Sequence, residues 1–96
     1  MWRQGDLLIV RAGAIPKDAV KCSNRVLAEG EATGHMHELD CGEVFLQGEA
    51  HYFMVEEKTS TTLTHPEHKP ITFEPGVYKV TKQREYEPKG WRYVRD

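Results

Sequence analysis

Apolar and polar positions alternate with a period of two along most of the chain. This period is typical of β-strands, in which successive side chains point to opposite faces of a sheet. Clusters of Gly, Pro, Asn and Asp separate the alternating stretches, as turn residues do between strands. We expect strands at residues 6–12, 25–31, 35–39, 43–47, 50–56, 61–64, 71–73 and 77–86. No stretch carries the amphipathic pattern of a three-turn helix. The sequence therefore predicts one all-β domain over residues 1–96, a small barrel or sandwich of antiparallel hairpins with little or no helix.

The turn residues predict how some of these strands are connected. Asp40, Cys41 and Gly42 favour a tight turn, so we expect a hairpin whose first arm carries His35 and His37. Pro75 and Gly76 suit the two central positions of a type II turn and predict a second hairpin, between residues 71–73 and 77–80. Pro66 and Pro70 favour a rigid loop between them. Residues 87–96 are interpreted as a flexible tail or a short edge strand.

Composition narrows the choice of function. The chain has 96 residues and a formal net charge of −2, which gives no overall attraction to nucleic acid or to a membrane surface. Its longest apolar run, Leu7–Val10, is far shorter than the roughly 20 residues that cross a bilayer. The N-terminus lacks a signal-peptide pattern, so we expect a cytoplasmic protein. Cys22 and Cys41 are then expected to be reduced thiols, with a disulfide as the alternative in an oxidising compartment.

The most informative chemistry is the distribution of histidine. All five histidines lie between Gly34 and His68. His35 and His37 share one face of a strand, and His65 and His68 can converge across a tight turn that also holds Glu67. Neutral imidazole is a ligand for zinc, iron, nickel and manganese.

We therefore predict a divalent transition-metal site. Its ligands would be His35, His37 and either His65 or His68, with Glu43 or Glu67 as the carboxylate. The alternative is that these histidines lie on a solvated surface and bond to water. His51 stands alone on an apolar face and is interpreted as a packed edge residue.

Part of this arrangement resembles an abbreviated cupin. The first cupin motif runs from a Gly through His-x-His to a Glu and a second Gly, and Gly30, His35, His37, Glu43 and Gly48 stand in that order here. Five residues separate His37 from Glu43, where the family has three or four. The resemblance implies a cupin-like or jelly-roll-like barrel whose strand histidines hold a metal.

A second resemblance covers residues 65–88 together with the Thr-Gly-His-Met-His segment at 33–37. These stretches are similar to a group of small uncharacterised bacterial and phage-associated proteins. That likeness implies a defined β-domain, but it does not imply any activity.

A different class of function follows from the C-terminal region, where basic and aromatic residues interleave. Such a surface could stack unpaired bases and neutralise phosphates, or bind a protein partner or a second copy of the chain. The alternative is that these aromatics anchor the last strand to the fold. The candidate residues are Tyr78, Lys82, Arg84, Tyr86, Trp91, Arg92 and Tyr93. Whether the chain is an enzyme stays open at this point.

Overall fold

Strands and turns make up the described part of the chain, and it contains no helix. The computed structural model describes residues 1–30, 34–82, 84–87 and 90–93, of which the last two ranges are described by their backbone alone. The strands are β1 (Trp2–Gln4), β2 (Leu7–Ala12), β3 (Val20–Lys21), β4 (Val26–Glu29), β5 (Met36–Leu39), β6 (Glu43–Gln47), β7 (Ala50–Val55), β8 (Thr61–His65), β9 (His68–Phe73), β10 (Gly76–Lys82), β11 (Arg84–Glu87) and β12 (Gly90–Tyr93). The predicted all-β class is confirmed.

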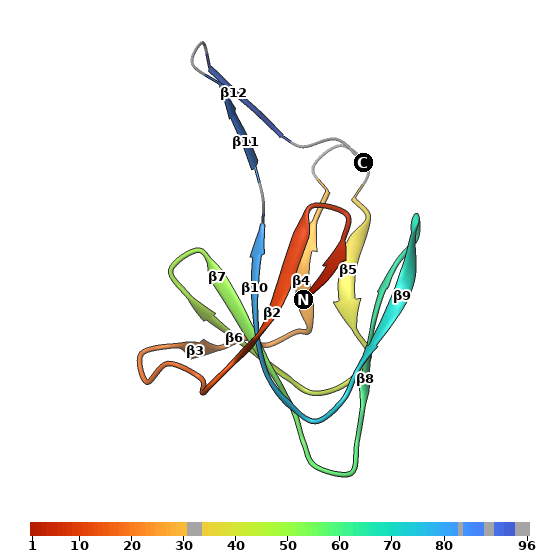
Figure 1. Ribbon diagram of the computed structural model, residues 1–96. Coiled ribbons are helices and arrows are strands. Elements are labelled where there is room, and N and C mark those ends of the chain that lie inside the picture. The colour runs from red at the N-terminus through yellow and green to blue at the C-terminus, as the bar shows by residue number, and fades with distance from the viewer. Residues whose placement is uncertain (31–33, 83, 88–89, 94–96) are drawn as a thin grey trace.

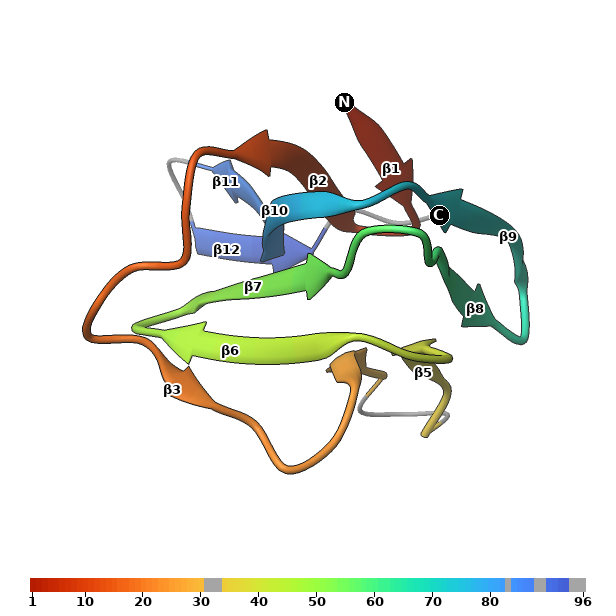
Figure 2. The same ribbon diagram turned by 90° about the horizontal axis from the view of Figure 1, so that it is seen from below.

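Two antiparallel sheets form the body of the molecule (Figures 1 and 2). A six-stranded sheet has the order β1-β2-β10-β7-β6-β3, and a four-stranded sheet has the order β4-β5-β8-β9. Neither of these sheets closes on itself, so the architecture is sandwich-like and not a closed barrel. The β11–β12 hairpin continues from β10 and extends away from both sheets in Figure 1.

Two of the predicted hairpins are wrong. β5 pairs with β4 and β8, whereas β6 pairs with β3 and β7, so residues 40–42 connect the two sheets. Residues 74–75 likewise lead from β9 in the four-stranded sheet to β10 in the six-stranded sheet. The chain bends at residues 40–42 and at Pro75, but each strand that follows pairs with partners from elsewhere in the sequence.

The loop predicted between Pro66 and Pro70 is also corrected. Only Pro66 and Glu67 form the turn, and β9 begins at His68. Pro70 is accommodated because β9 is an edge strand, where a missing N–H group costs no sheet hydrogen bond. A tight β8–β9 hairpin therefore stands where a loop was expected.

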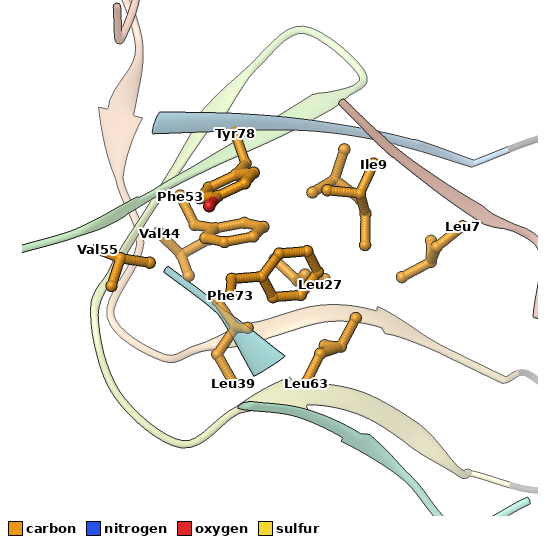
Figure 3. Packing of buried hydrophobic residues seen from close by; sticks show 11 residues of the cluster. Leu7, Ile9, Leu27, Leu39, Val44, Phe53, Val55, Leu63, Phe73 and Tyr78 are labelled. Carbon is orange, nitrogen blue, oxygen red and sulfur yellow. The ribbon is translucent and has the colours of Figure 1, made fainter. Parts of the chain in front are cut away.

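The core lies between the two sheets (Figure 3). The six-stranded sheet contributes Leu7, Ile9, Val44, Phe53, Val55, Tyr78 and Val80, and the four-stranded sheet contributes Leu27, Leu39, Leu63 and Phe73. Stacked rings at its centre join the layers: Phe53 and Tyr78 lie 4.8 Å apart between ring centroids, and Phe73 approaches both edge-on. Such pairs add about 0.5–1.5 kcal/mol each beyond the area that they bury.

β1 was not predicted, although it belongs to the six-stranded sheet and its side chains contact the other sheet. Trp2 pairs with Ile9 in the sheet register, and its ring packs edge-on against Phe73 and Tyr78, with centroids 5.2 and 5.4 Å away. Gln4 pairs with Leu7 and so points into the same interior. The N-terminal strand thus places one aromatic and one polar side chain between the sheets.

Other expectations concern the cysteines, the termini and membranes. Cys22 and Cys41 are not joined by a disulfide. No helix in the described residues is long and apolar enough to cross a membrane. The tail predicted at residues 87–96 falls partly on residues 88–89 and 94–96, which lie outside the described residues, while β12 pairs with β11.

Candidate functional site

Four of the five histidines come together at one end of the four-stranded sheet. His65 is at the centre of the group: its ring centroid lies 4.2 Å from that of His37, 4.7 Å from that of His68 and 5.8 Å from that of His35. The centroids of His37 and His68 are 6.0 Å apart. We call His35, His37, His65 and His68 the histidine cluster. The two sequence pairs therefore do lie face to face.

The β8–β9 hairpin brings its two histidines together. His65 ends β8, His68 begins β9, and the two residues are cross-strand partners on either side of a two-residue turn. The register shifts between this pair and the Leu63–Ile71 pair, which marks a β-bulge. Bulges redirect side chains and are frequent beside functional sites.

His37 comes from the neighbouring strand, β5. On that strand His37 and Leu39 are buried and Met36 and Glu38 are exposed, as the period of two requires. His37 is 6% exposed and is the only buried histidine in the chain, all of whose histidines are described. A buried imidazole needs hydrogen-bond partners, because an unsatisfied polar group costs about 1–3 kcal/mol there.

Gln4 supplies one such partner. Its Oε1 atom lies 2.8 Å from His37 Nδ1, and its Nε2 atom donates to the carbonyl oxygens of Leu63 and Lys69 at 3.1 and 2.9 Å. Gln4 itself is 3% exposed. This residue was missed by the sequence analysis. The β1 pairing could not be read locally, and no spacing links Gln4 to the histidines.

Glu67 contacts two further histidines through two different groups. Its carboxylate Oε1 atom accepts a hydrogen bond from His35 Nδ1 at 3.0 Å, so the carboxylate partner predicted at this position does join the cluster. Its backbone N–H group donates to His65 Nδ1 at 3.0 Å. The turn residue therefore contacts the rings of both His35 and His65.

A hollow opens beside the cluster, and a larger one adjoins it without touching the four histidines. The smaller, of about 180 Å³, is lined by His37, His65, Glu67 and His68 together with Asp6, Ala28, Glu29, Gly30 and Lys82. The larger, of about 630 Å³, lies within the usual size range of small-molecule sites and shares Ala28, Glu29 and Lys82 with the smaller one. The cluster therefore faces a space through which solvent or a ligand can reach it.

As they stand, the rings do not present a formed metal site. Among the described residues, no three His, Cys, Asp or Glu side chains are arranged to hold a metal ion. The rings pack on one another, with interplanar angles from 16° for His37 and His68 to 82° for His35 and His65. The structure thus brings the predicted ligands together without pointing their nitrogen atoms at one centre.

Other candidate residues lie elsewhere. Glu43 is in the six-stranded sheet, where its carboxylate is 2.6 Å from Lys21 Nζ. His51 lies on β7 and lines the larger hollow, and burial lowers its pKa from 6.5. His51 was interpreted as a packed edge residue, but β7 is paired on both sides, so the residue packs within the sheet and not at its edge.

The C-terminal surface is described only in part. Tyr78 is fully buried, and its hydroxyl donates to the carbonyl oxygen of Glu74, so it offers no ring for stacking. The Lys82 ammonium is 3.8 Å from the Asp6 carboxylate and lines both hollows. The remaining side chains of that proposed surface lie outside the described part of the chain: Arg84, Tyr86, Trp91, Arg92 and Tyr93.

Comparison with known proteins places this chain in a family. A model of a domain of unknown function, DUF8820, matches residues 3–83. The chain belongs to the DUF8820 family. The matched DUF8820 range contains Gln4 and the whole histidine cluster. No curated protein and no solved structure matches the chain.

Proposed function

We propose that this DUF8820 domain binds a divalent transition metal through the histidine cluster. The observation that carries the proposal is the separation of the rings. Two imidazoles on one metal, with metal–nitrogen distances of about 2.0–2.1 Å, have centroids roughly 5 Å apart. The pairs formed by His37, His65 and His68 have separations of 4.2, 4.7 and 6.0 Å.

Those separations mean that ring rotation, and not backbone movement, would complete the site. His37, His65 and His68 line the smaller hollow and are the proposed ligands, with the Glu67 carboxylate as the candidate fourth. His35 lies on the far side of His65 and is bonded to Glu67, so we place it outside the ligand set. This choice keeps both members of the His65–His68 pair and one member of the His35–His37 pair.

The hydrogen bonds tell which ligand has to rearrange. A histidine that binds a metal through Nε2 carries its proton on Nδ1, and that proton is donated to a neighbouring acceptor. His37 has such an acceptor in Gln4. His65 Nδ1 instead accepts the Glu67 N–H group, so His65 would have to give up that bond on binding the metal.

The donor set limits the metals. Imidazole with one carboxylate suits zinc, iron, nickel or manganese, and three imidazoles leave a fourth coordination position for water or another ligand. The cupin resemblance of the His-x-His segment agrees with this chemistry. In the cytoplasm, where the sequence analysis expects the protein, Cys22 and Cys41 would stay reduced. Neither cysteine belongs to the proposed ligand set.

The first test is metal binding by the full 96-residue chain, purified without a histidine tag. The metal content of the protein as isolated is measured first, and zinc is then titrated into chelator-treated protein by calorimetry. We expect one zinc per chain. His37→Ala should weaken zinc binding by more than the about 10–100-fold that loss of an outer-shell partner costs. The matched control is His51→Ala, which removes a histidine from the other sheet and should leave the affinity unchanged.

Two results would reject the proposed function. One is wild-type protein that contains no transition metal and takes up none of zinc, iron(II), nickel or manganese. The other is zinc binding of equal strength in the wild type and in the His37→Ala, His65→Ala and His68→Ala variants.

A further inference from the structure

The hydrogen bonds of Gln4 determine which way its side-chain amide faces. Its nitrogen lies within hydrogen-bond distance of two backbone carbonyl oxygens, those of Leu63 and Lys69. A carbonyl can only accept, so the atom that faces both of them has to be the amide NH₂ group. The other end, which faces His37, is therefore the oxygen. The usual ambiguity between the two amide orientations does not arise here.

The tautomer of His37 follows from this orientation. The Gln4 oxygen can only accept, so His37 Nδ1, 2.8 Å away, carries a proton and donates it. In the neutral ring the lone pair is then on Nε2. His65 is held in the opposite way, because its Nδ1 atom accepts the Glu67 N–H group and its neutral ring carries the proton on Nε2.

We infer that Gln4 is the positioning residue of the metal site: it holds His37 in the tautomer and orientation of an Nε2 ligand before any metal arrives. This inference rests on the proposed function and names the residue that prepares one ligand for it. Outer-shell acceptors of this kind orient the ring of a ligating histidine and raise its basicity. Gln4 reaches His37 from outside the sheet that holds the cluster.

The inference also connects the metal site to the docking of the N-terminal strand. Gln4 belongs to β1 of the six-stranded sheet, while its three partners belong to β5, β8 and β9 of the four-stranded sheet. If β1 separates from the interior, His37 loses its acceptor. Metal binding should accordingly favour the docked strand, because a ligand that prefers one state shifts the equilibrium toward it.

The first experiment needs no metal. Two-bond ¹H–¹⁵N correlation spectra of metal-free, ¹⁵N-labelled protein report which ring nitrogen of each histidine is protonated. In the wild type we expect a protonated Nδ1 and an unprotonated Nε2 for His37, and the reverse for His65. A wild-type His37 with its proton on Nε2 would overturn the inference at once.

Three variants then separate positioning from packing. Gln4→Met removes the acceptor while keeping the length of the side chain, and it should mix the His37 tautomers and weaken zinc binding about 10–100-fold. Gln4→Glu keeps an acceptor for Nδ1–H but places a carboxylate against two carbonyl oxygens. It should therefore destabilise the fold and still retain the Nδ1–H tautomer of His37. Gln47→Met is the control, because Gln47 belongs to the six-stranded sheet and its amide bonds to Asp18, which is not part of the cluster.

The outcomes for Gln4 and for the metal site are distinguishable. If Gln4→Met leaves both the His37 tautomer and the zinc affinity as in the wild type, the role of Gln4 is overturned and the metal site stands. If Gln4→Glu loses zinc as completely as Gln4→Met despite a retained tautomer, Gln4 acts through packing and the inference is also overturned. Wild-type protein that takes up no metal would overturn the proposed function, and the ligand role of His37 with it.

Discussion

The surroundings of His51 affect its protonation. Its ring is half-buried on β7, and desolvation lowers its pKa from the ordinary value of 6.5. Burial disfavours the charged imidazolium, and the backbone of His51 is paired with Val80 at the centre of the six-stranded sheet. The folded state therefore holds His51 neutral at a pH where the unfolded chain begins to protonate it.

This difference predicts a pH dependence of stability. As the pH falls below 6.5, the unfolded state binds a proton at His51 that the folded state resists, so the free energy of unfolding decreases. His51→Gln removes this contribution. We expect the melting temperature of the variant to fall less than that of the wild type between pH 7.5 and pH 5.5, as measured by circular dichroism. Equal losses in the two proteins would contradict the assignment.

At the same scale, the sequence predicts which side chains gather but not how they are oriented. Spacings of two and three residues were enough to predict that His35 and His37, and His65 and His68, would form pairs. The tautomers depend on Gln4, which lies 33 residues from His37, and on one backbone N–H group at Glu67. The Gln4 contact leaves no local pattern, because it arises only once β1 has docked. The Glu67 contact is local, but it depends on a two-residue turn at Pro66 and Glu67, where a longer loop was expected.

At the scale of elements, the connection between β5 and β6 shows what turn residues can and cannot determine. Asp40 follows β5 and accepts hydrogen bonds from the Thr62 N–H group and the Thr61 hydroxyl, and these bonds lower its pKa. The chain is thereby held to β8, and the segment that follows passes to the other sheet. Gly42 makes this passage with a φ of +94°.

Gly42 should consequently be intolerant of a side chain. A Cβ atom there would lie 2.9 Å from the carbonyl oxygen of Met54, and the positive φ adds strain of its own. We expect Gly42→Ala to lower the free energy of unfolding by about 2–4 kcal/mol, from strain and overpacking together. Urea denaturation measures the change.

Gly48 provides the matched control for this substitution. It also has a positive φ, +59°, but a Cβ atom there would meet nothing within 4 Å. Gly48→Ala should cost only the conformational strain of about 1–2 kcal/mol. If the two variants were equally stable, the close approach to Met54 would not be a constraint.

The strands themselves were largely predictable, whereas their partners were not. The strand pattern located β2, β6 and β7 almost to the residue, because each is a dense apolar run bounded by turn residues. Pairing depends instead on which faces meet across the core. The predicted type II turn does not form, because Gly76 is the first residue of β10 and has a φ of +147°. Pro75 instead bends the chain between the two sheets, an outcome that the Pro-Gly pair alone could not predict.

At the scale of the whole molecule, the histidine cluster is tied to the junction of the two layers. The proposed ligands belong to the four-stranded sheet, and Gln4 connects them to the six-stranded sheet through β1. The core supports the same junction, since Trp2 on β1 packs against Phe73 of one sheet and Tyr78 of the other. A metal bound at the cluster would therefore stabilise the contact between the layers as well as its own hairpin.

This arrangement predicts that zinc raises the melting temperature of the entire domain in one transition. A ligand that binds only the folded state adds about 2.7 kcal/mol at a free concentration 100 times its Kd, which for a domain of this size corresponds to about 10–20 °C. Differential scanning calorimetry of chelator-treated protein with and without zinc measures the shift. His51→Gln should keep the shift, and His37→Ala should lose it.

Because protons compete with the metal for imidazole nitrogen, the shift should be smaller at pH 5.5 than at pH 7.5. An equal shift in His37→Ala, or one that does not depend on pH, would mean that zinc stabilises the protein from somewhere other than the cluster.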